Sequence, residues 1–493
     1  GHAVPASEAL ARQFENSNGL VIESSPGHYK FSHRYFQEYL AGQHYARGPG
    51  RAEALNRAGS IHWREPFRLM ASLAGHEGQN LYYVLTLIQD FHTSSSVEAQ
   101  HLAAEMLCDI TRPRLALWGY EDVIDEHGTE PSLWRQMQIT ATSHAEDQAL
   151  PLPFRSRAAD IAAALGDLRF TSSDGTSERL EIPSVLVPHG PFHVGTLRVD
   201  PETVPGGFVG EPRLLDFSDY RISKYAVTNS QFEAFVTTGG YSDATLWRSP
   251  RALGWVTGDA DVLREIRRHW LETVYEHHAK EIRDREIDPE RLEHEAERRT
   301  APRAAPFYWY DGRFHCPNQP VVGVNYWEAE AYCEWATRRG RAEGTLTANE
   351  AIVIPSEFEW ERASRPKDDD RIFPWGDEWN DLLAHTTTNT LNLRQPTAVG
   401  IYPPYWPDSP LDMAGNVWEW TSSLFLPYDD SYDSRRCDSD SLDERVVRGC
   451  SWYHFAPLAA CSVRAVDRSY NLFYDVGFRV AIIDIRSPRP GLV

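Results

Sequence analysis

Residues 412–422 read Asp412-Met413-Ala414-Gly415-Asn416-Val417-Trp418-Glu419-Trp420-Thr421-Ser422. Two further stretches follow nearer the carboxyl end, Val447-Arg448-Gly449-Cys450-Ser451-Trp452 and Val476-Gly477-Phe478-Arg479-Val480-Ala481. Tryptophan, tyrosine, glycine and proline are frequent in this part of the chain. The pattern predicts short strands that alternate with turns.

Helix-start signals lie upstream of these stretches. Ser356 precedes Glu359 by three positions, which is the spacing of a capping box. Residues 327–335 have the apolar spacing of an amphipathic helix. Thr228 or Asn229 is a competent N-cap for another helix. Composition and pattern alone therefore predict a loop-rich domain with both helices and strands.

The order and spacing of these motifs resemble the formylglycine-generating-enzyme and sulfatase-modifying-factor family, from about residue 180 to residue 485. The resemblance implies an α+β fold that is an irregular relative of the C-type lectin domain, and we assign residues 180–493 to it. The charged stretch at about 261–299 departs from the family. Its Glu and Arg residues recur at three- and four-residue spacings, which predicts a solvated helical insertion.

The region before this domain reads as mainly helical, and residues 1–175 are predicted to form a separate domain. Its clearest helix is expected over residues 95–108, with Ser95 and Glu98 in a capping box. Residues 171–177 are polar and rich in turn formers, so the domain boundary is placed there.

The amino-terminal part also contains a predicted hairpin, residues 19–31, followed by a helix that begins Phe31-Ser32-His33-Arg34-Tyr35-Phe36. This arrangement resembles the end of the ATPase module in NACHT-type NTPases. No G-x-x-x-x-G-K-[ST] loop occurs in the sequence, so no nucleotide site is expected in this chain. The resemblance implies an ATPase module upstream; whatever the family, the plain structural interpretation of the segment is a buried amphipathic helix.

Bulk properties limit the partners. With 493 residues the chain is too long for one core, so two or more domains are expected. The net charge of −22 argues against nucleic acid, whose phosphates would be repelled. No apolar run is long enough to span a membrane. Six cysteines without a CxxC pair predict neither a disulfide scaffold nor a zinc ribbon, and a cytoplasmic location is expected.

Enzymatic members of the resembled family bind copper through two cysteines that follow the G-S-[WF] motif. Residues 453–459 contain no cysteine, and the nearest candidates are Cys450 and Cys461. A related branch uses a three-histidine iron site, but the sequence has no H-x-x-x-H-x-E motif. We therefore expect a protein that is not an enzyme, with a copper- or iron-dependent oxidase as the alternative.

Another branch of the fold comprises the variable proteins of diversity-generating retroelements, which diversify codons between R-G-G-S-W and G-F-R. Mutagenised AAC or AAT codons become NNY, which cannot encode Trp, Gln, Met, Lys or Glu. None of these five residue types occurs between Trp452 and Gly477. The resemblance implies a diversified binding surface at about 453–475. The predicted ligand-binding residues are Tyr453, His454, Phe455, Leu458, Asp467, Ser469, Tyr470, Asn471, Leu472, Phe473, Tyr474 and Asp475.

Tyrosine offers large contact area at low entropy cost, and Ser, Asn and Asp add adaptable hydrogen bonds. The expected partner is an unknown protein or another macromolecule, and its capture would be reported to the upstream ATPase. A structural adaptor without diversification, with an ordinary core-facing aromatic loop, remains the other alternative. The resemblance further implies a calcium site at Asp412, Gly415, Val417 and Glu419. Alternatively, Asp412 and Glu419 only satisfy backbone donors.

Overall fold

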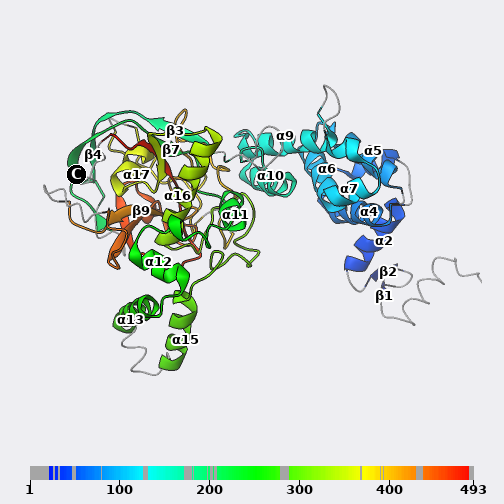
Figure 1. Ribbon diagram of the computed structural model, residues 1–493. Coiled ribbons are helices and arrows are strands. Elements are labelled where there is room, and N and C mark those ends of the chain that lie inside the picture. The colour runs from blue at the N-terminus through cyan, green and yellow to red at the C-terminus, as the bar shows by residue number, and fades with distance from the viewer. Residues whose placement is uncertain are drawn as a thin grey trace, which may run out of the picture. The chain divides into compact units, whose positions relative to one another are not determined.

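The computed structural model describes residues 21–487, except 26–27, 32–33, 47–50, 79, 126–130, 171–179, 181, 197, 200–203, 205–207, 278–287, 367–368, 389, 392 and 429–436. The chain divides into two compact units, which Figure 1 shows. The helical unit contains the chain up to His144 together with Ala164–Gly166. The lectin-like unit contains Ala145–Ala163 and the chain from Asp167 onward.

The helical unit begins with an antiparallel hairpin, β1 (Val21–Ser25) and β2 (His28–Phe31), and helix α2 (Arg34–Ala46) follows it as predicted. Its other helices are α3 (Arg51–Arg57), α4 (Arg64–Glu77), α5 (Leu81–His92), α6 (Val97–Ile110), α7 (Arg112–Leu117), α8 (Glu121–Ile124) and α9 (Leu133–Glu146). Helix α6 is capped by Ser96, one residue after the expected Ser95, because the Ser96 hydroxyl accepts from the Ala99 amide. Among the described residues, no helix is both long and apolar enough to cross a membrane.

The predicted linker, residues 171–177, lies outside the described residues. Helix α10 (Leu152–Leu165) precedes it and belongs largely to the lectin-like unit. Its Ala159 packs in a buried cluster with Tyr402, and the Asn318 amide donates to the Ala159 carbonyl at 2.8 Å. The lectin-like unit therefore starts earlier than the predicted residue 180.

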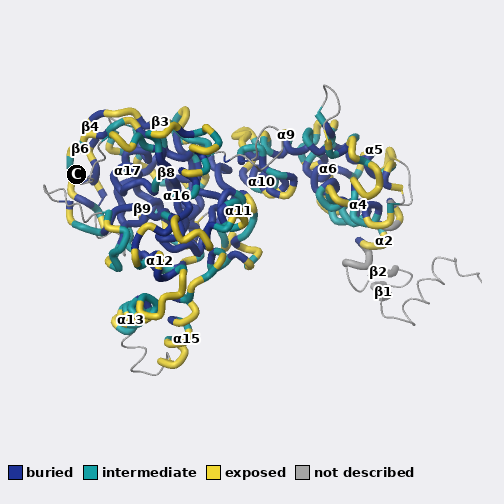
Figure 2. The backbone as a smooth tube through the Cα atoms, in the orientation of Figure 1, coloured by how far each residue is buried: buried dark blue, intermediate teal, exposed yellow. Residues whose placement is uncertain are grey.

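Two sheets form the framework of the lectin-like unit. The five-stranded sheet has the order β12 (Val476–Phe478), β9 (Trp418–Leu424), β10 (Glu444–Arg448), β11 (Val463–Arg468), β5 (Phe208–Val209). The four-stranded sheet has the order β3 (Ser184–Val187), β7 (Tyr220–Ser223), β13 (Ala481–Asp484), β8 (Glu350–Val353). Strands β4 (Gly190–Val194) and β6 (Arg213–Phe217) form a separate two-stranded antiparallel sheet. Every residue of β9 is buried, as Figure 2 shows, because both faces of this inner strand are covered.

Besides α10 and the helices of the charged insertion, this unit contains α11 (Asn229–Thr237), α12 (Pro250–Thr257), α16 (Tyr326–Glu343) and α17 (Glu357–Ser364). Thr228, Asn325 and Ser356 each form a capping box with the residue three positions later, at α11, α16 and α17 respectively. The sequence signals at Thr228 and Ser356 are thus confirmed.

The charged insertion forms two helices, α13 (Ala260–His277) and α15 (Pro289–Thr300), joined through residues outside the described part. Figure 2 shows much of both helices as exposed or half-buried, in keeping with their charged sequence. The insertion nevertheless contacts the predicted binding segment, because His269 Nδ1 lies 2.8 Å from the Tyr470 hydroxyl. The Arg299 guanidinium also donates to the Leu472 carbonyl at 2.9 Å.

Candidate ligand-binding site

Five residues of the predicted binding segment form a partly exposed aromatic group. Tyr453 is 54% exposed, and Phe455 and Phe473 are each 39% exposed. His454 and Tyr474 are half-buried. We call these five residues the aromatic face. They come from two loops, one after β10 and one before β12, so the five-stranded sheet supports both.

The aromatic face rests on a buried aromatic base. The Tyr453 ring meets the Tyr474 ring edge-on, with centroids 5.5 Å apart. Tyr474 in turn packs against Trp452 at 5.6 Å and Phe314 at 6.1 Å, and both of these are buried. Ring contacts of this kind hold Tyr453 in place and so lower the entropy that its side chain loses on binding.

Half of the predicted ligand-binding residues are buried, and this corrects their assignment to a surface. They are Leu458, Asp467, Ser469, Tyr470, Leu472 and Asp475. Leu458 and Tyr470 belong to the main core, and the Ser469 hydroxyl accepts from the Arg445 guanidinium at 3.2 Å. Asn471 is half-buried, and its amide donates to Asp467 at 2.6 Å. These side chains hold the segment to the framework and are not available to a ligand at the surface.

A polar cluster fixes His454 within the aromatic face. The Ser451 hydroxyl donates to Asp475 at 2.7 Å and lies 2.8 Å from His454 Nδ1. The Trp418 indole N–H also points to Nδ1, at 3.2 Å. Ser451 is fully buried. Ser451 and Asp475 both approach Nδ1 of His454, so neither of them contacts the other ring nitrogen, Nε2. The arrangement therefore orients His454 and is not built as a nucleophilic triad.

The framework beneath the site contains buried ion pairs. The Arg464 guanidinium donates to both Glu357 oxygens, at 2.6 and 3.0 Å. Arg448 donates to Glu361 at 3.0 Å, and all four side chains are buried. Because each pair joins α17 to the sheet, the pairs fix the strands from which the loops of the aromatic face emerge.

The donor set of the predicted calcium site does not fit the ion. Glu419 forms a two-bond ion pair with Arg479, at 2.5 and 2.8 Å, and also accepts from the Trp360 indole at 2.6 Å. Asp412 accepts from the Gly400 amide at 2.7 Å, and burial raises the pKa of Asp412 to about 6. A guanidinium thus occupies the position of the cation at Glu419. Within the described residues, no group of three or more His, Cys, Asp or Glu could hold a metal ion.

The two candidate copper ligands, Cys450 and Cys461, are not suited to copper either. Cys450 and Cys461 are both buried free thiols. The Cys450 thiol contacts the Phe455 carbonyl, whereas the Cys461 thiol contacts the Ser364 carbonyl. Burial raises the pKa of both thiols, that of Cys461 to about 11, so neither supplies a thiolate near neutral pH. Cys450 has a φ of 70°, a conformation that glycine adopts more easily.

We expect Cys450 and Cys461 to resist alkylation in the folded protein. Iodoacetamide at pH 8 should leave both unmodified during a time in which the urea-unfolded chain reacts fully, because only an accessible thiolate is nucleophilic. Peptide mass spectrometry measures the modified fraction at each position. Equal labelling of folded and unfolded chains would show that the thiols are accessible. Copper binding by Cys450 and Cys461 would then be a candidate again.

Asp467 is expected to make stability depend on pH. Burial and the charge of Asp475 raise the pKa of Asp467 to about 7, above its ordinary 3.8. The folded chain then holds more protons than the unfolded chain between about pH 4 and pH 7, so the free energy of unfolding falls as pH rises through that window. The total fall is at most about 4 kcal/mol.

The substitution Asp467→Asn should remove this fall. The quantity compared is the melting temperature of Asp467→Asn minus that of the unchanged protein. This difference should rise from pH 4 to pH 7 and then stay constant. Differential scanning calorimetry across that range measures it. A difference that does not change with pH would contradict the buried ionisation.

A further residue outside the predicted segment, Tyr308, also contacts the site. Tyr308 lies 6.1 Å from Tyr474, centroid to centroid, and Tyr310, two residues later, is 93% exposed. Arg298 lies over the Phe307 ring at 4.4 Å, which ties this loop to the insertion. The aromatic run Phe307-Tyr308-Trp309-Tyr310 was the available signal. Its closeness to Tyr474 is a long-range contact that the sequence does not show.

Comparisons with known proteins bear on the same region. A family model, the sulfatase-modifying factor enzyme 1-like domain, matches residues 173–483. The hercynine oxygenase of Mycolicibacterium smegmatis is 31% identical over 299 residues, covering 55% of this chain and 54% of that protein. The formylglycine-generating enzyme of Thermomonospora curvata is 29% identical over 263 residues, covering 48% of this chain and 69% of that protein.

The solved structure of Treponema denticola variable protein 1 aligns over 60% of this chain and 94% of that one, with a TM-score of 0.38 and 16% identity. The chain spans about half the length of the hercynine oxygenase that it matches. The family model covers more than half of the chain and includes the sheets and loops described above. The chain therefore belongs to the family of proteins with a sulfatase-modifying factor enzyme 1-like domain, and its lectin-like unit has the C-type-lectin-like fold of that family.

Proposed function

We propose that the chain is a ligand-binding protein whose lectin-like unit presents the aromatic face to a macromolecular partner. The observation that carries the proposal is the placement of Tyr453, Phe455 and Phe473, which are exposed although the loops around them are anchored in the core. Exposed aromatic side chains on a fixed base are the usual anchors of protein interfaces.

The division of the segment into exposed and buried positions supports a changeable surface on a constant frame. Tyr453 and Phe473 are exposed, whereas Ser469 and Asp475 make buried hydrogen bonds, to Arg445 of β10 and to Ser451 respectively. Replacement of an exposed ring changes the contact surface but leaves those bonds intact. Replacement of Ser469 or Asp475 would instead leave buried donors without an acceptor.

A catalytic function is the second candidate, because the similarity to the hercynine oxygenase of Mycolicibacterium smegmatis extends over 299 residues. Donors for a redox metal are poorly placed, since the Cys450 and Cys461 thiols are buried and their pKa values are raised. Copper(I) added to the full chain, with a cysteine-containing peptide and oxygen, tests this candidate. Multiple turnover of the peptide thiol would overturn the binding proposal, and its absence is the expected result.

The gene and its surroundings provide the direct test of diversification. We expect a nearby reverse transcriptase gene and a near-copy of the 3′ coding end that differs only at adenines of the copy. The differences should fall in the codons of the exposed and half-buried residues Tyr453, His454, Phe455, Phe473 and Tyr474. They should be rare at Ser469 and Asp475, whose side chains are buried.

Two outcomes of that comparison would contradict the proposal. A copy whose differences occur equally at buried and exposed codons would show that the aromatic face is not the selected surface. A gene with no such copy nearby would leave a binding protein without diversification, which is the adaptor alternative. Deep sequencing of the segment from a culture separates the two cases, because only a diversified gene yields variant codons.

We further propose that binding at the aromatic face is coupled to an ATPase module of NACHT type. The hairpin of β1 and β2 followed by α2 has the element order of the end of that module. A gene model that extends upstream through a G-x-x-x-x-G-K-[ST] loop is the expected result. An upstream sequence without such a loop would remove the coupling but would leave the aromatic face as a binding site.

A further inference from the structure

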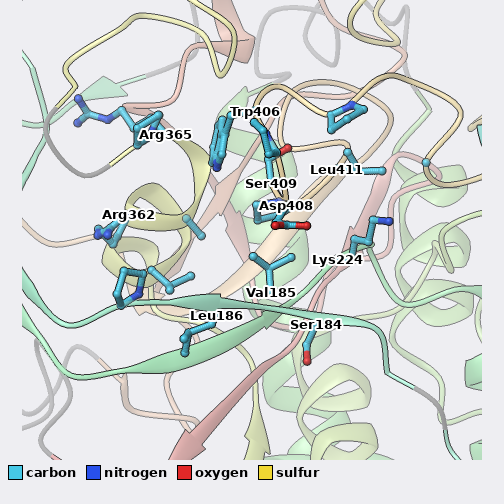
Figure 3. A pocket seen from close by; sticks show the side chains of 18 of the residues that line it. Ser184, Val185, Leu186, Lys224, Arg362, Arg365, Trp406, Asp408, Ser409 and Leu411 are labelled. Carbon is cyan, nitrogen blue, oxygen red and sulfur yellow. The ribbon is translucent and has the colours of Figure 1, made fainter. Parts of the chain in front are cut away.

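A cleft of about 950 Å³ lies along strand β3 of the lectin-like unit, and the aromatic face does not line it. Its lining includes all of β3, the end of α17, and the loop of residues 404–411. In Figure 3, Val185 points from the strand toward Asp408, whereas Leu186 and Ser184 point to the opposite side of the sheet. Strand β3 is the edge strand of its four-stranded sheet.

When β3 pairs with β7, every second residue of β3 directs its backbone amide and carbonyl away from the sheet. The Lys224 amide donates to the Pro183 carbonyl at 2.7 Å, so residues 183 and 224 form a hydrogen-bonded pair. Hydrogen-bonded and open pairs alternate along an antiparallel ladder. The open pairs are therefore Ser184 with Ser223 and Leu186 with Arg221. Consistently, the Ser223 amide donates to Val480, on the other side of β7.

The amides and carbonyls of Ser184 and Leu186 consequently point to the free edge. Within the described part of the chain, no other group makes a hydrogen bond to them. The strand sequence Ser184-Val185-Leu186-Val187 has no charged residue, and Leu186 is 62% exposed. An uncharged edge with open backbone groups is a template for another extended chain.

One carboxylate of the cleft, that of Asp408, is placed to receive a basic side chain. Arg365 is engaged with Glu361 in the interior, Arg362 lies over the Phe192 ring, and Lys224 lies over the Tyr225 ring. The two carboxylates of the lining, Glu146 and Asp408, are both exposed. No ion pair to either is present among the described residues, although Glu146 accepts a hydrogen bond from the Tyr225 hydroxyl. The net charge of −22 adds to the attraction for cations.

We propose that this cleft binds an extended peptide segment, which adds as a further strand to the free edge of β3. The backbone of the segment bonds to Ser184 and Leu186. One apolar side chain is seated over Val185 beside Trp406, and a Lys or Arg side chain two positions away, on the same face of the added strand, reaches Asp408. The site is separate from the aromatic face and does not depend on the proposed function.

The test uses the full chain and a phage-displayed random heptapeptide library. Selected peptides should carry an apolar residue and, two positions away on the same strand face, a Lys or Arg. Their synthetic versions should bind Leu186→Pro at least about tenfold more weakly, because proline removes the outward-facing amide. Leu186→Thr changes the same side chain but keeps the amide, and it should bind normally. Asp408→Lys should weaken the basic peptides.

The thermal stability of Leu186→Pro should equal that of Leu186→Thr, since the lost amide makes no bond within the sheet. If Leu186→Pro fails to fold, the same comparison is made with peptides that are N-methylated at alternate positions, which should lose binding to the unchanged chain. Selected peptides that are acidic, or that bind Leu186→Pro and Leu186→Thr equally, would overturn the proposal. A library that yields no peptide binder would overturn it as well.

Discussion

The substitution Glu357→Gln is expected to destabilise the lectin-like unit by about 3–5 kcal/mol, because it removes the charge from a buried carboxylate that two arginines share. Arg464 donates to Glu357 at 2.6 and 3.0 Å, and Arg448 approaches it to 3.4 Å. The Tyr428 hydroxyl adds a further bond at 2.8 Å. Glutamine keeps the shape of the side chain, but it removes the negative charge that balances the buried guanidinium groups.

The measurement is urea unfolding of the full chain, followed by tryptophan fluorescence. Asp261→Asn is the matched control, because Asp261 also pairs with an arginine but is 87% exposed. Exposed pairs contribute little, so this control should lose less than about 0.5 kcal/mol. Since native domains are stable by only about 5–15 kcal/mol, the loss at Glu357 should be plain. Equal losses in the two variants would show that the buried network is not what stabilises the unit.

The sequence was informative where the signal is local. Capping boxes at Ser356 and Thr228 could be read directly, because cap and partner lie three residues apart. The ion pair between Glu357 and Arg464 could not be read in the same way, since 107 positions separate its partners. Glu357 follows the predicted cap Ser356, whereas Arg464 lies in none of the motifs that carry the family resemblance, and only the fold brings the two side chains together.

The binding segment shows the same limit at the level of single residues. Codon chemistry marked Tyr453 and Tyr470 alike as candidates, because both are tyrosines in the same segment. The structure exposes 54% of Tyr453 but only 3% of Tyr470, whose hydroxyl meets His269 of the insertion. The sequence gives no sign of which residues the charged helices would meet, so their contact with the segment could not be expected. Which tyrosines face solvent thus depends on long-range packing.

The substitution Glu419→Gln tests whether Glu419, at the predicted metal site, is paired with an arginine or binds a calcium ion. The Arg479 guanidinium is fully buried and meets Glu419 at 2.5 and 2.8 Å. Loss of the carboxylate charge should therefore destabilise the lectin-like unit by about 3–5 kcal/mol. Asp484→Asn is the control, because its ion pair with Arg486 lies at the surface, and the loss there should be below about 1 kcal/mol.

The same variants are then melted with millimolar calcium and with a chelator. A ligand that binds only the folded state raises the melting temperature in proportion to the logarithm of its concentration. Because Glu419 is already neutralised by Arg479 and Asp412 accepts from the Gly400 amide, calcium should not shift the melting temperature of the unchanged chain. A shift of several degrees that Glu419→Gln abolishes would instead show that the carboxylate binds the ion and that the Arg479 pair opens to admit it.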